Sequence, residues 1–458
     1  MKSEVTVESL ALYINRGITP KYTEVIDDSV IVLNQKCIRD FKVSLEPSRR
    51  NDLSKRKITE GKMLKKHDVL INSTGVGTLG RVAQYFGADD VATVDSHVTI
   101  VRPNPELVDP IYFGYLMKSK QSLIESFAEG TTGQTELNRN SVKELLLEIV
   151  NDIPTQKIIG GILLEIDQKL ELNTQTNQTL EQIAQALFKS WFVDFDPVKA
   201  KIETLAAGGS AEDAELAAMR VISAKTVDEL NSLKASNPEQ FNKLAQTAAL
   251  FPAAMQDSEL GEIPEGWEVS SLSELIKITG GGTPKRSEET YWNGDIPWFS
   301  VKDVPSEGNV FVVDTDEKIT ELGLNKSSTK LLPKGTTIIT ARGTVGKLAL
   351  VGTDMCMNQS CYGVLGKSVG DFYNYFNLKE AVSTLQRNTH GAVFDTITTQ
   401  TFDTYSLAFS GVELANKFDA LVAPLLQNIE ANVRQNIELA TLRDTLLPKL
   451  LSGELVGE

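Results

Sequence analysis

A long amphipathic pattern occurs once in each half of this 458-residue chain. Both copies advance in alternating steps of three and four residues, which is the spacing of helices that pair in a coiled coil. A chain with this repeat is expected to hold two similar halves joined by long helices. The seam positions are Ile159, Ile162, Ile166, Lys169, Asn173, Thr176, Leu180, Ile183 and Leu187 in the first copy, and Phe418, Leu421, Leu425, Asn428, Asn432, Gln435, Leu439, Leu442 and Leu446 in the second.

Each copy has a polar centre with an asparagine at the matching position, Asn173 or Asn432. A buried amide costs stability unless it finds a hydrogen-bonding partner, and two asparagines can satisfy each other in one register of a helix pair. Because the helices have equal lengths and matching patterns, we predict an antiparallel pair in which Asn173 lies near Asn432. The alternative is two separate amphipathic helices whose middles are solvated.

Short loop motifs recur in the same order in both halves. Residues 17–21 (GITPK) match residues 281–285 (GGTPK), and residues 77–83 (GTLGRVA) match residues 343–349 (GTVGKLA). Self-similarity of this kind indicates repeated structural units. We therefore predict an α+β fold with an internal pseudo-twofold repeat, in which two β-rich domains are separated by a pair of long antiparallel coiled-coil helices. Strands are expected at residues 68–72, 96–102, 337–340 and 361–365.

The repeat divides the chain into five segments. We predict a first β-rich domain at residues 1–152, a first long helix at 153–196, a connector at 197–258, a second β-rich domain at 259–410 and a second long helix at 411–458. The connector has no counterpart in the second half. Its content of Ala, Glu and Lys predicts short helices, and a disordered linker is the alternative.

The formal net charge of −15 is unusual for a protein that binds nucleic acid, but the charge is unevenly distributed. Between Ser48 and Lys66, eight basic side chains stand against two acidic ones. Phosphate contacts supply affinity without sequence information, so this basic segment is expected to follow a DNA backbone. A chain with this overall charge is expected to bind DNA weakly by itself and to gain positive charge from a partner.

Three further features limit the class of protein. No run of about 18 apolar residues could span a membrane, and the N-terminus has no apolar signal segment, so we expect a cytoplasmic protein. The three cysteines form no disulfide or zinc pattern. The three histidines are scattered, and no catalytic constellation or metal site can be assigned, so we expect no active site in this chain.

The glycine turns resemble phosphate-binding loops only in part. Residues 343–348 (GTVGKL) lack a P-loop pattern, because Ala341 stands where the first glycine belongs and Leu348 replaces the Ser or Thr that would hold magnesium. These turns either shape a β-domain or bring backbone and neighbouring cations to DNA.

Basic residues near these turns are candidate DNA contacts, since lysine and arginine donate to phosphate oxygens and to guanine O6 and N7. The alternative for each is a solvated surface side chain. The candidates are Lys21, Lys36, Arg39, Arg49, Arg50, Lys55, Arg56, Lys57, Arg81, Lys285, Lys302, Arg342 and Lys347.

Apolar side chains also gather near the ends of the two long helices. They either pack in the core of the helix pair or form an apolar end that docks a partner protein. These candidate docking residues are Leu187, Trp191, Phe192, Leu446 and Leu450.

Three motifs carry a family resemblance that covers essentially the whole chain. They are residues 187–197 (LFKSWFVDFDP), residues 261–267 (GEIPEGW) and residues 443–455 (RDTLLPKLLSGEL). With these motifs and the Gly-x-Thr-Pro turns, the chain resembles the specificity subunit of a Type I restriction–modification enzyme. One departure is that residues 16–20 read RGITP where residues 280–284 read GGGTP, so we expect a differently shaped opening turn in the first domain.

The resemblance implies a non-catalytic subunit with two target recognition domains, each of which reads one half of a bipartite site in double-stranded DNA. It implies that the helices pair antiparallel and fix the spacer. It also implies assembly with two methyltransferase (modification) subunits and with restriction (motor-nuclease) subunits. S-adenosylmethionine, ATP and magnesium would then belong to those partners, with no cofactor in this chain.

Two other classes of protein remain open from the residues alone. A coiled-coil scaffold with two β-rich ligand domains and no DNA role would explain the net acidity and the long helices. An autonomous methyltransferase is disfavoured, because the sequence lacks an Asn/Asp-Pro-Pro-aromatic motif.

Overall fold

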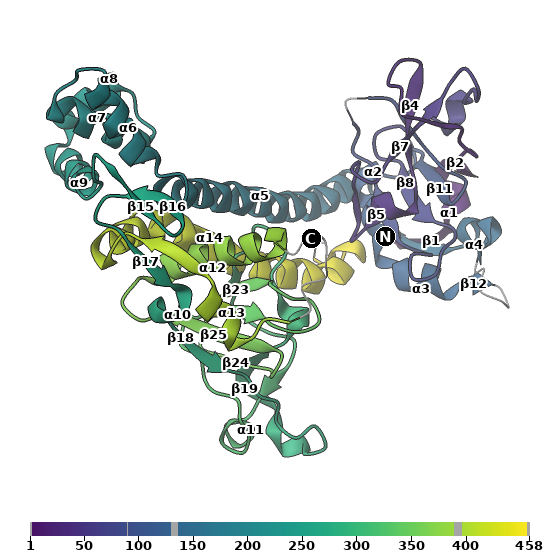
Figure 1. Cartoon of the computed structure of the whole chain (residues 1–458). Coiled ribbons are helices and arrows are strands. Elements are labelled where there is room, and N and C mark those ends of the chain that lie inside the picture. The colour runs from purple at the N-terminus through teal and green to yellow at the C-terminus, as the bar shows by residue number, and fades with distance from the viewer. Residues whose placement is uncertain (1, 89, 130–135, 389–395, 456–458) are drawn as a thin grey trace. The chain divides into compact units, whose positions relative to one another are not determined.

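The computed structural model describes residues 2–88, 90–129, 136–388 and 396–455. The chain forms two compact units, one of Met1–Leu170 with Glu438–Glu458 and the other of Glu171–Ile437. Each unit holds one β-rich domain and a part of both long helices, α5 (Ile153–Phe192) and α14 (Val412–Leu451) (Figure 1). The mixed α+β fold class predicted from the sequence is confirmed.

The first domain contains two four-stranded sheets. One is antiparallel with the order β2-β11-β8-β9, and the other has the order β10-β4-β7-β3 with β10 parallel to β4. The central strand β8 is buried along its whole length, as its apolar sequence requires. The strands are β1 Lys2–Thr6, β2 Ala11–Arg16, β3 Tyr22–Thr23, β4 Ser29–Leu33, β5 Ile38–Arg39, β6 Lys42–Val43, β7 Arg49–Asp52, β8 Val69–Asn72, β9 Val82–Gln84, β10 Ala92–Val94, β11 Val98–Pro103, β12 Ala128–Glu129, β13 Glu136–Leu137 and β14 Leu146–Val150.

Short helices complete the first domain. Helix α2 covers the central sheet and is capped by Asp109, whose carboxylate accepts hydrogen bonds from the backbone N–H groups of Ile111 and Tyr112. Strand β1 pairs with β14, so the first and last strands of the domain lie side by side. The helices are α1 Val7–Leu10, α2 Pro110–Ser119, α3 Gln121–Ser126 and α4 Arg139–Lys143, with 3₁₀ turns η1 Gln35–Cys37 and η2 Glu60–Lys62.

The second domain has a five-stranded sheet with the order β18-β25-β22-β23-β20 and a three-stranded sheet with the order β21-β19-β24. Helix α12 packs against strands of the five-stranded sheet. The strands are β15 Met255–Ser258, β16 Gly261–Pro264, β17 Glu268–Ser271, β18 Ile276–Gly280, β19 Trp292–Phe299, β20 Phe311–Val312, β21 Lys318–Ile319, β22 Thr337–Thr340, β23 Leu348–Val351, β24 Cys356–Met357, β25 Cys361–Gly366 and β26 Ser406–Phe409. The helices are α10 Leu272–Leu275, α11 Glu321–Asn325, α12 Asp371–Asn388 and α13 Thr399–Thr404, with η3 Glu289–Tyr291 and η4 Val301–Asp303.

The two domains share one topology. In both, a central hairpin-like ladder places one strand (β11 or β25) between two antiparallel neighbours. Both have a parallel strand pair in their other sheet, β10 with β4 and β24 with β19. Both also pair an early strand with the last strand before a long helix, β1 with β14 and β17 with β26. The sequence repeat therefore reflects a repeated structural unit, with β20 as an addition in the second domain.

The long helices pair antiparallel, but not through all of the predicted seam positions. In the second unit, the Asn173 amide donates to Asn436 Oδ1 at 2.8 Å, and the Asn432 amide donates to Asn177 Oδ1 at 2.9 Å. Residue numbers thus rise along α5 as they fall along α14. Asn173 and Asn432 both lie in the polar centre of the pair, but each amide bonds to a residue one turn away from the other asparagine.

The error lies in the phase of the heptad. The inward positions follow the first seam position by four residues, as in Ile159 and Leu163 or Phe418 and Val422, instead of three. Asn177 and Asn436 therefore join Asn173 and Asn432 in the polar centre, where the predicted seam residue Gln435 also accepts a hydrogen bond from the Asn173 amide at 2.8 Å. Several positions that the predicted phase placed in the seam are exposed in the structure, including Ile162, Lys169, Ile183, Leu421, Asn428 and Leu442.

The helix-end residues Trp191, Phe192 and Leu450 are buried, so their predicted role in partner docking is wrong, whereas docking by the half-buried Leu187 and Leu446 stays a prediction. Trp191 is 1% exposed and packs against Phe251 and Phe418, and Phe192 packs against Tyr373 in the second domain. Leu450 is 5% exposed in the core of the first domain. Leu187 and Leu446 are half-buried beside these two cores.

Each β-rich domain is therefore completed by the last turns of the helix that belongs to the other repeat. In the first unit, the Tyr112 hydroxyl donates to the Leu451 carbonyl at 2.8 Å and accepts from the Val150 backbone N–H at 3.2 Å. In the same unit, Asp167 of α5 bonds to Arg443 of α14 at 2.7 Å. Both ends of the chain thus contribute to the core of one unit.

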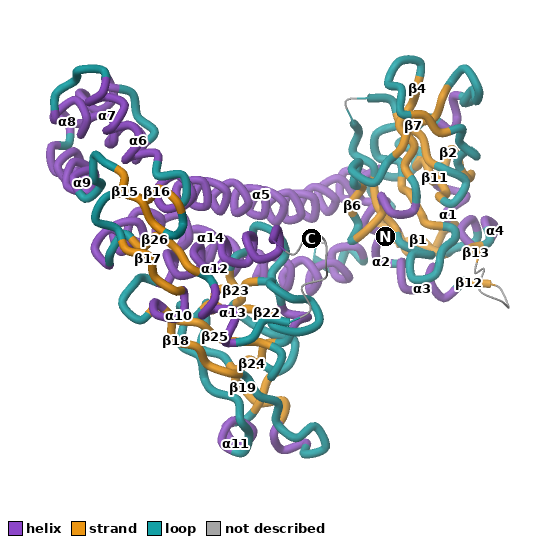
Figure 2. Tube along the Cα trace, in the orientation of Figure 1, coloured by secondary structure: helices purple, strands orange, loops and turns teal. Residues whose placement is uncertain are grey.

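The connector between α5 and the second domain is helical, not a disordered linker, over α6 Asp196–Ala206, α7 Ala211–Ser223, α8 Val227–Ser236 and α9 Pro238–Ala249 (Figure 2). Lys201 is buried in this bundle, where its ammonium donates to Glu215 and to the Phe251 carbonyl, both at 2.7 Å. In the described residues, no helix has the length and apolar character needed to cross a membrane.

The asparagine layer generates a prediction for stability. Asn432→Ala would leave the buried Oδ1 of Asn177 without its donor, which costs about 1–3 kcal/mol. Hydrogen–deuterium exchange of peptides from α5 should show this loss, while the matched change at exposed Asn428 should leave exchange unchanged. Equal exchange in the two variants would contradict the asparagine layer.

Candidate nucleic-acid interface

Four turns meet at one end of the central sheet in the first domain. The Ile18 N–H donates to the Val94 carbonyl at 2.9 Å, and the Asp95 N–H donates to the Leu33 carbonyl at 2.9 Å. A third bond joins the Ser73 N–H to the His97 carbonyl at 2.7 Å. These bonds tie together the turns at residues 17–18, 33–36, 73–77 and 95–97.

The second domain repeats the same arrangement. The corresponding bonds run from Gly282 to Met357 at 3.0 Å, from Asn358 to Phe299 at 2.9 Å and from Ala341 to Ser360 at 2.8 Å. They join the turns at residues 281–282, 299–302, 341–343 and 358–360. We call each set of four turns the four-turn edge of its domain. Loops at one end of a rigid sheet are a common place for binding residues.

The first turn of each edge requires glycine. A Cβ atom on Gly17 would lie 1.9 Å from the Val94 carbonyl oxygen, and one on Gly281 would lie 1.9 Å from the Asn358 carbonyl oxygen. The residue after this glycine is Ile18 in one turn and Gly282 in the other, yet both donate the matching backbone bond, to Val94 and to Met357. We expected a differently shaped first turn because Arg16 and Ile18 stand where the second domain has Gly280 and Gly282. That expectation is wrong at the backbone bond to the neighbouring strand, which both domains make.

The later glycine motifs are tight turns. Gly77, Gly80, Gly343 and Gly346 all have positive φ, and the N–H groups of Gly80 and Gly346 return to the strands just left, each with a 2.8 Å bond. The turn between strand and motif is two residues longer in the first domain. This geometry supports the structural interpretation of the motifs and leaves their tips free to face a ligand.

The structure divides the candidate cations into two groups by exposure and contact. Lys36, Lys302 and Arg342 have exposed side chains on the four-turn edges, and Lys347 is exposed one turn further on. Lys285 is exposed beside the first turn of the second edge. These residues are placed to meet an anionic ligand.

Other candidates already bond to groups of the protein. Arg50 donates to Ser29 at 2.7 Å and pairs with Asp90 at 2.5 Å, and Arg81 donates to the Gly77 carbonyl at 2.8 Å. Arg39 pairs with its neighbour Asp40, and Lys55 pairs with Asp52. Arg50 and Arg81 are half-buried, so their guanidinium groups are held within the domain.

A basic group surrounds Asn51 in the first domain. The Asn51 side chain accepts from the Lys21 N–H at 2.9 Å and donates to the Arg56 carbonyl at 2.9 Å, which gathers Lys21, Arg56 and Lys57 near β7. Arg49 of β7 stacks over Tyr22, with its guanidinium carbon 3.6 Å from the ring centroid. The side chains of Lys21, Arg49, Arg56 and Lys57 are exposed, so this group can meet an anionic ligand.

Lys62 lies in the predicted basic segment, but it is half-buried and bonds to the protein. Its ammonium donates to the Gly17 carbonyl at 2.6 Å, so it supports the first turn of the edge. Burial lowers the pKa of Lys62, and the nearby Arg56 charge lowers it further.

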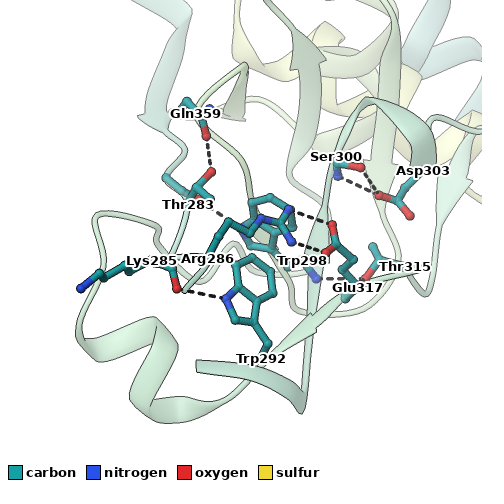
Figure 3. A network of polar contacts seen from close by, with 11 residues as sticks. Thr283, Lys285, Arg286, Trp292, Trp298, Ser300, Asp303, Thr315, Glu317 and Gln359 are labelled. Carbon is teal, nitrogen blue, oxygen red and sulfur yellow. Dashed lines mark hydrogen bonds and ion pairs between the residues drawn. The ribbon is translucent and has the colours of Figure 1, made fainter. Parts of the chain in front are cut away.

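Sequence reasoning missed Arg286, which follows Lys285 directly. Its guanidinium carbon lies 4.0 Å from the ring centroid of Trp292 and 4.9 Å from that of Trp298, and it bonds to both carboxylate oxygens of Glu317 (Figure 3). The hydrogen bond to Glu317 raises the pKa of Arg286, and the same bond lowers the pKa of Glu317.

The neighbouring backbone is fixed by the same rings. Trp298 Nε1 donates to the Gly282 carbonyl at 3.0 Å, and Trp292 Nε1 donates to the Lys285 carbonyl at 3.3 Å (Figure 3). Arg286 and the two tryptophans therefore hold the turn that carries Lys285. The first domain has the opposite arrangement of ring and cation. The aromatic residue Tyr22 directly follows Lys21, and the cation stacked on it is Arg49 of β7. Two tryptophans shortly after the Gly-Thr-Pro motif were the signal that could have revealed this clamp.

A family model described as the Type I restriction modification DNA specificity domain matches residues 47–182 and 264–410. This chain belongs to that family. Each matched range contains the central strands and glycine turn of one domain, so the chain carries two specificity domains. It is a specificity subunit, and therefore belongs to the recognition subunits of Type I restriction–modification systems and not to the catalytic ones.

Known relatives support this assignment over most of the chain. The Type I restriction enzyme HindI specificity subunit of Haemophilus influenzae is 34% identical over 406 residues, which cover 86% of this chain and 88% of that protein. The MjaIX specificity subunit of Methanocaldococcus jannaschii is 26% identical over 40% of this chain and 43% of its own. The crystal structure of the S subunit from M. genitalium has the same fold, with a TM-score of 0.58 at 16% identity over 98% of this chain and 96% of that one.

The Arg286 clamp makes a testable prediction for this specificity subunit. Arg286→Ala should raise amide exchange in residues 283–286 about five-fold, because cation–π stacking and a half-exposed ion pair together contribute roughly 1 kcal/mol. Lys285→Ala is the matched control and should leave exchange unchanged, since its side chain is exposed. An unchanged exchange rate in Arg286→Ala would show that the clamp does not hold the turn.

Proposed function

We propose that this chain reads a bipartite DNA site, one half-site per domain, and directs adenine methylation and DNA cleavage by partner subunits. The observation that carries the proposal is the repeated four-turn edge, which has the same backbone bonds in both domains and different exposed side chains. A shared frame with different side chains suits two readers of two different sequences. Cations on both edges, such as Lys36 and Lys302, have the chemistry to meet phosphates or guanine.

The paired helices are proposed to set the spacer between the half-sites. A 40-residue helix has a length of about 60 Å at 1.5 Å per residue. The asparagine layer supports a single register of the pair, because a slipped register would leave buried amides without partners. We expect half-sites about one helical turn of DNA apart, as for other paired readers.

The helices are also proposed to dock two methyltransferase subunits, with restriction subunits joining that assembly. Two apolar side chains are exposed on the helices in each unit, Ile162 and Leu442 in the first and Leu421 and Ile183 in the second. Ile162 and Leu421 occupy the same place in the repeat, and so do Ile183 and Leu442. Equivalent exposed apolar residues suit a partner that is present in two copies. S-adenosylmethionine, ATP and magnesium are proposed to act in the partner subunits.

A domain exchange tests the recognition proposal. Replacement of residues 1–152 by the corresponding domain of another specificity subunit should change one half of the methylated sequence and leave the other half intact. Replacement of residues 259–410 should change only the other half. Methylome sequencing of cells that express each chimera with modification subunits gives the outcome. A change of both half-sites by either chimera would refute the assignment of one half-site to each domain.

Native mass spectrometry tests the docking proposal. Ile162→Asp and Leu421→Asp should each reduce the bound modification subunits from two to one, and the double variant should bind none, because a carboxylate in an apolar contact is costly to bury. Gln168→Asp and Gln427→Asp introduce the same charge at exposed, equivalent positions of the two helices. These controls should keep both partners, and two bound partners in the Ile162/Leu421 double variant would exclude this surface.

A further inference from the structure

The most exposed large apolar side chain in the described part of the chain lies on the four-turn edge of the first domain. Val76 is 83% exposed at the tip of the turn after β8. An isolated apolar side chain on a loop needs no explanation by itself. This valine differs because the loop beneath it is fixed in several places, so the fold holds it outward in one orientation.

Several contacts fix the turn. The Thr74 hydroxyl bonds to His97 Nδ1 at 2.7 Å, and the Leu79 N–H donates to the Gly75 carbonyl at 3.0 Å. Arg81 donates to the Gly77 carbonyl at 2.8 Å. Gly75 has φ of +103°, and a Cβ atom there would lie 2.5 Å from Gln35 Oε1, so the turn is packed against the neighbouring turn of the edge.

The matching turn of the second domain presents a cation instead. Arg342 follows Ala341, whose backbone bonds to Ser360 and Ile397 match the bonds of Ser73 to His97 and Leu137. This turn lacks the two-residue extension that carries Val76, and the Arg342 side chain is exposed. The equivalent turns therefore present different side chains, an isopropyl group on the extension of the first turn and a guanidinium group at the position of Thr74 in the second.

We propose that this turn reads a base edge in each half-site, and that Val76 contacts the C5 methyl group of a thymine while Arg342 donates to O6 and N7 of a guanine. Thymine offers the one apolar group among the base edges of the major groove, and guanine offers the paired acceptors that fit a guanidinium fork. The inference rests on the proposed recognition function and adds the identity of one base in each half-site.

Base analogues test the proposal once methylome sequencing has given the site. The full chain, assembled with modification subunits, is bound to duplexes in which each thymine of the first half-site is replaced in turn by deoxyuridine. One replacement should weaken binding about four-fold, the value expected for one buried methyl group. Val76→Ala should weaken binding to unmodified DNA and be insensitive to that replacement, while Val25→Ala, exposed away from the edge, should behave as wild type.

The second half-site is tested with 7-deazaguanine, which lacks the N7 acceptor. One replacement should weaken wild-type binding at least about five-fold, as for the loss of part of a bidentate contact. Arg342→Ala should lose this sensitivity because its methyl side chain has no donor for N7. Lys243→Ala, on exposed α9, is the charge-matched control and should keep it.

Several results would overturn the inference. They are a first half-site without an A·T pair, a second half-site without a G·C pair, and analogues that have no effect on wild type. Equal analogue sensitivity in the variants and in wild type would also overturn it. If Arg342→Ala weakens binding to every DNA sequence by the same factor, Arg342 contacts phosphate, and the guanine contact is refuted. If unmodified DNA is not bound sequence-specifically at all, the recognition function itself fails.

Discussion

The structure depends on a reciprocal exchange of helix ends. The last turn of α5 places Trp191 and Phe192 in the core of the second domain, and the last turn of α14 places Leu450 and Leu451 in the core of the first. Aromatic and aliphatic side chains of this size stabilise a core by about 1.5–3 kcal/mol each. Neither helix can leave its place without opening a domain core, so each domain is anchored on both helices.

The asparagine layer completes this constraint. Core packing fixes the helix ends. In the middle of the pair, the buried Asn173 and Asn177 need hydrogen-bonding partners, which favours a single register of the two helices. Asn177 also donates to Asn309 of the second domain at 2.9 Å. The same layer thus links the helix pair to the second β-rich domain within the second unit.

The sequence predicts the repeat, the two helices, their central asparagines and the glycine turns, because each of these is a local pattern that occurs twice. The phase of the seam was wrong because Lys169 and Asn428 repeat as faithfully as Asn177 and Asn436, so periodicity alone cannot select the inner row. The role of Arg286 and the protein partners of Arg50 and Arg81 were not predicted, because tertiary contacts set them. The apolar residues at the helix ends pack in the cores of domains that are distant in sequence, and a local pattern cannot show this.

Photo-crosslinking tests the central claim most directly, that each domain reads its own half-site. A benzophenone amino acid replaces Lys36 in one chain and Lys302 in another, at equivalent exposed places of the two edges. Each chain is assembled with modification subunits on DNA that carries the methylated site. We predict that the first probe reacts with one half-site and the second with the other. Reaction of both probes with the same half-site, or with DNA outside the site, would contradict the account.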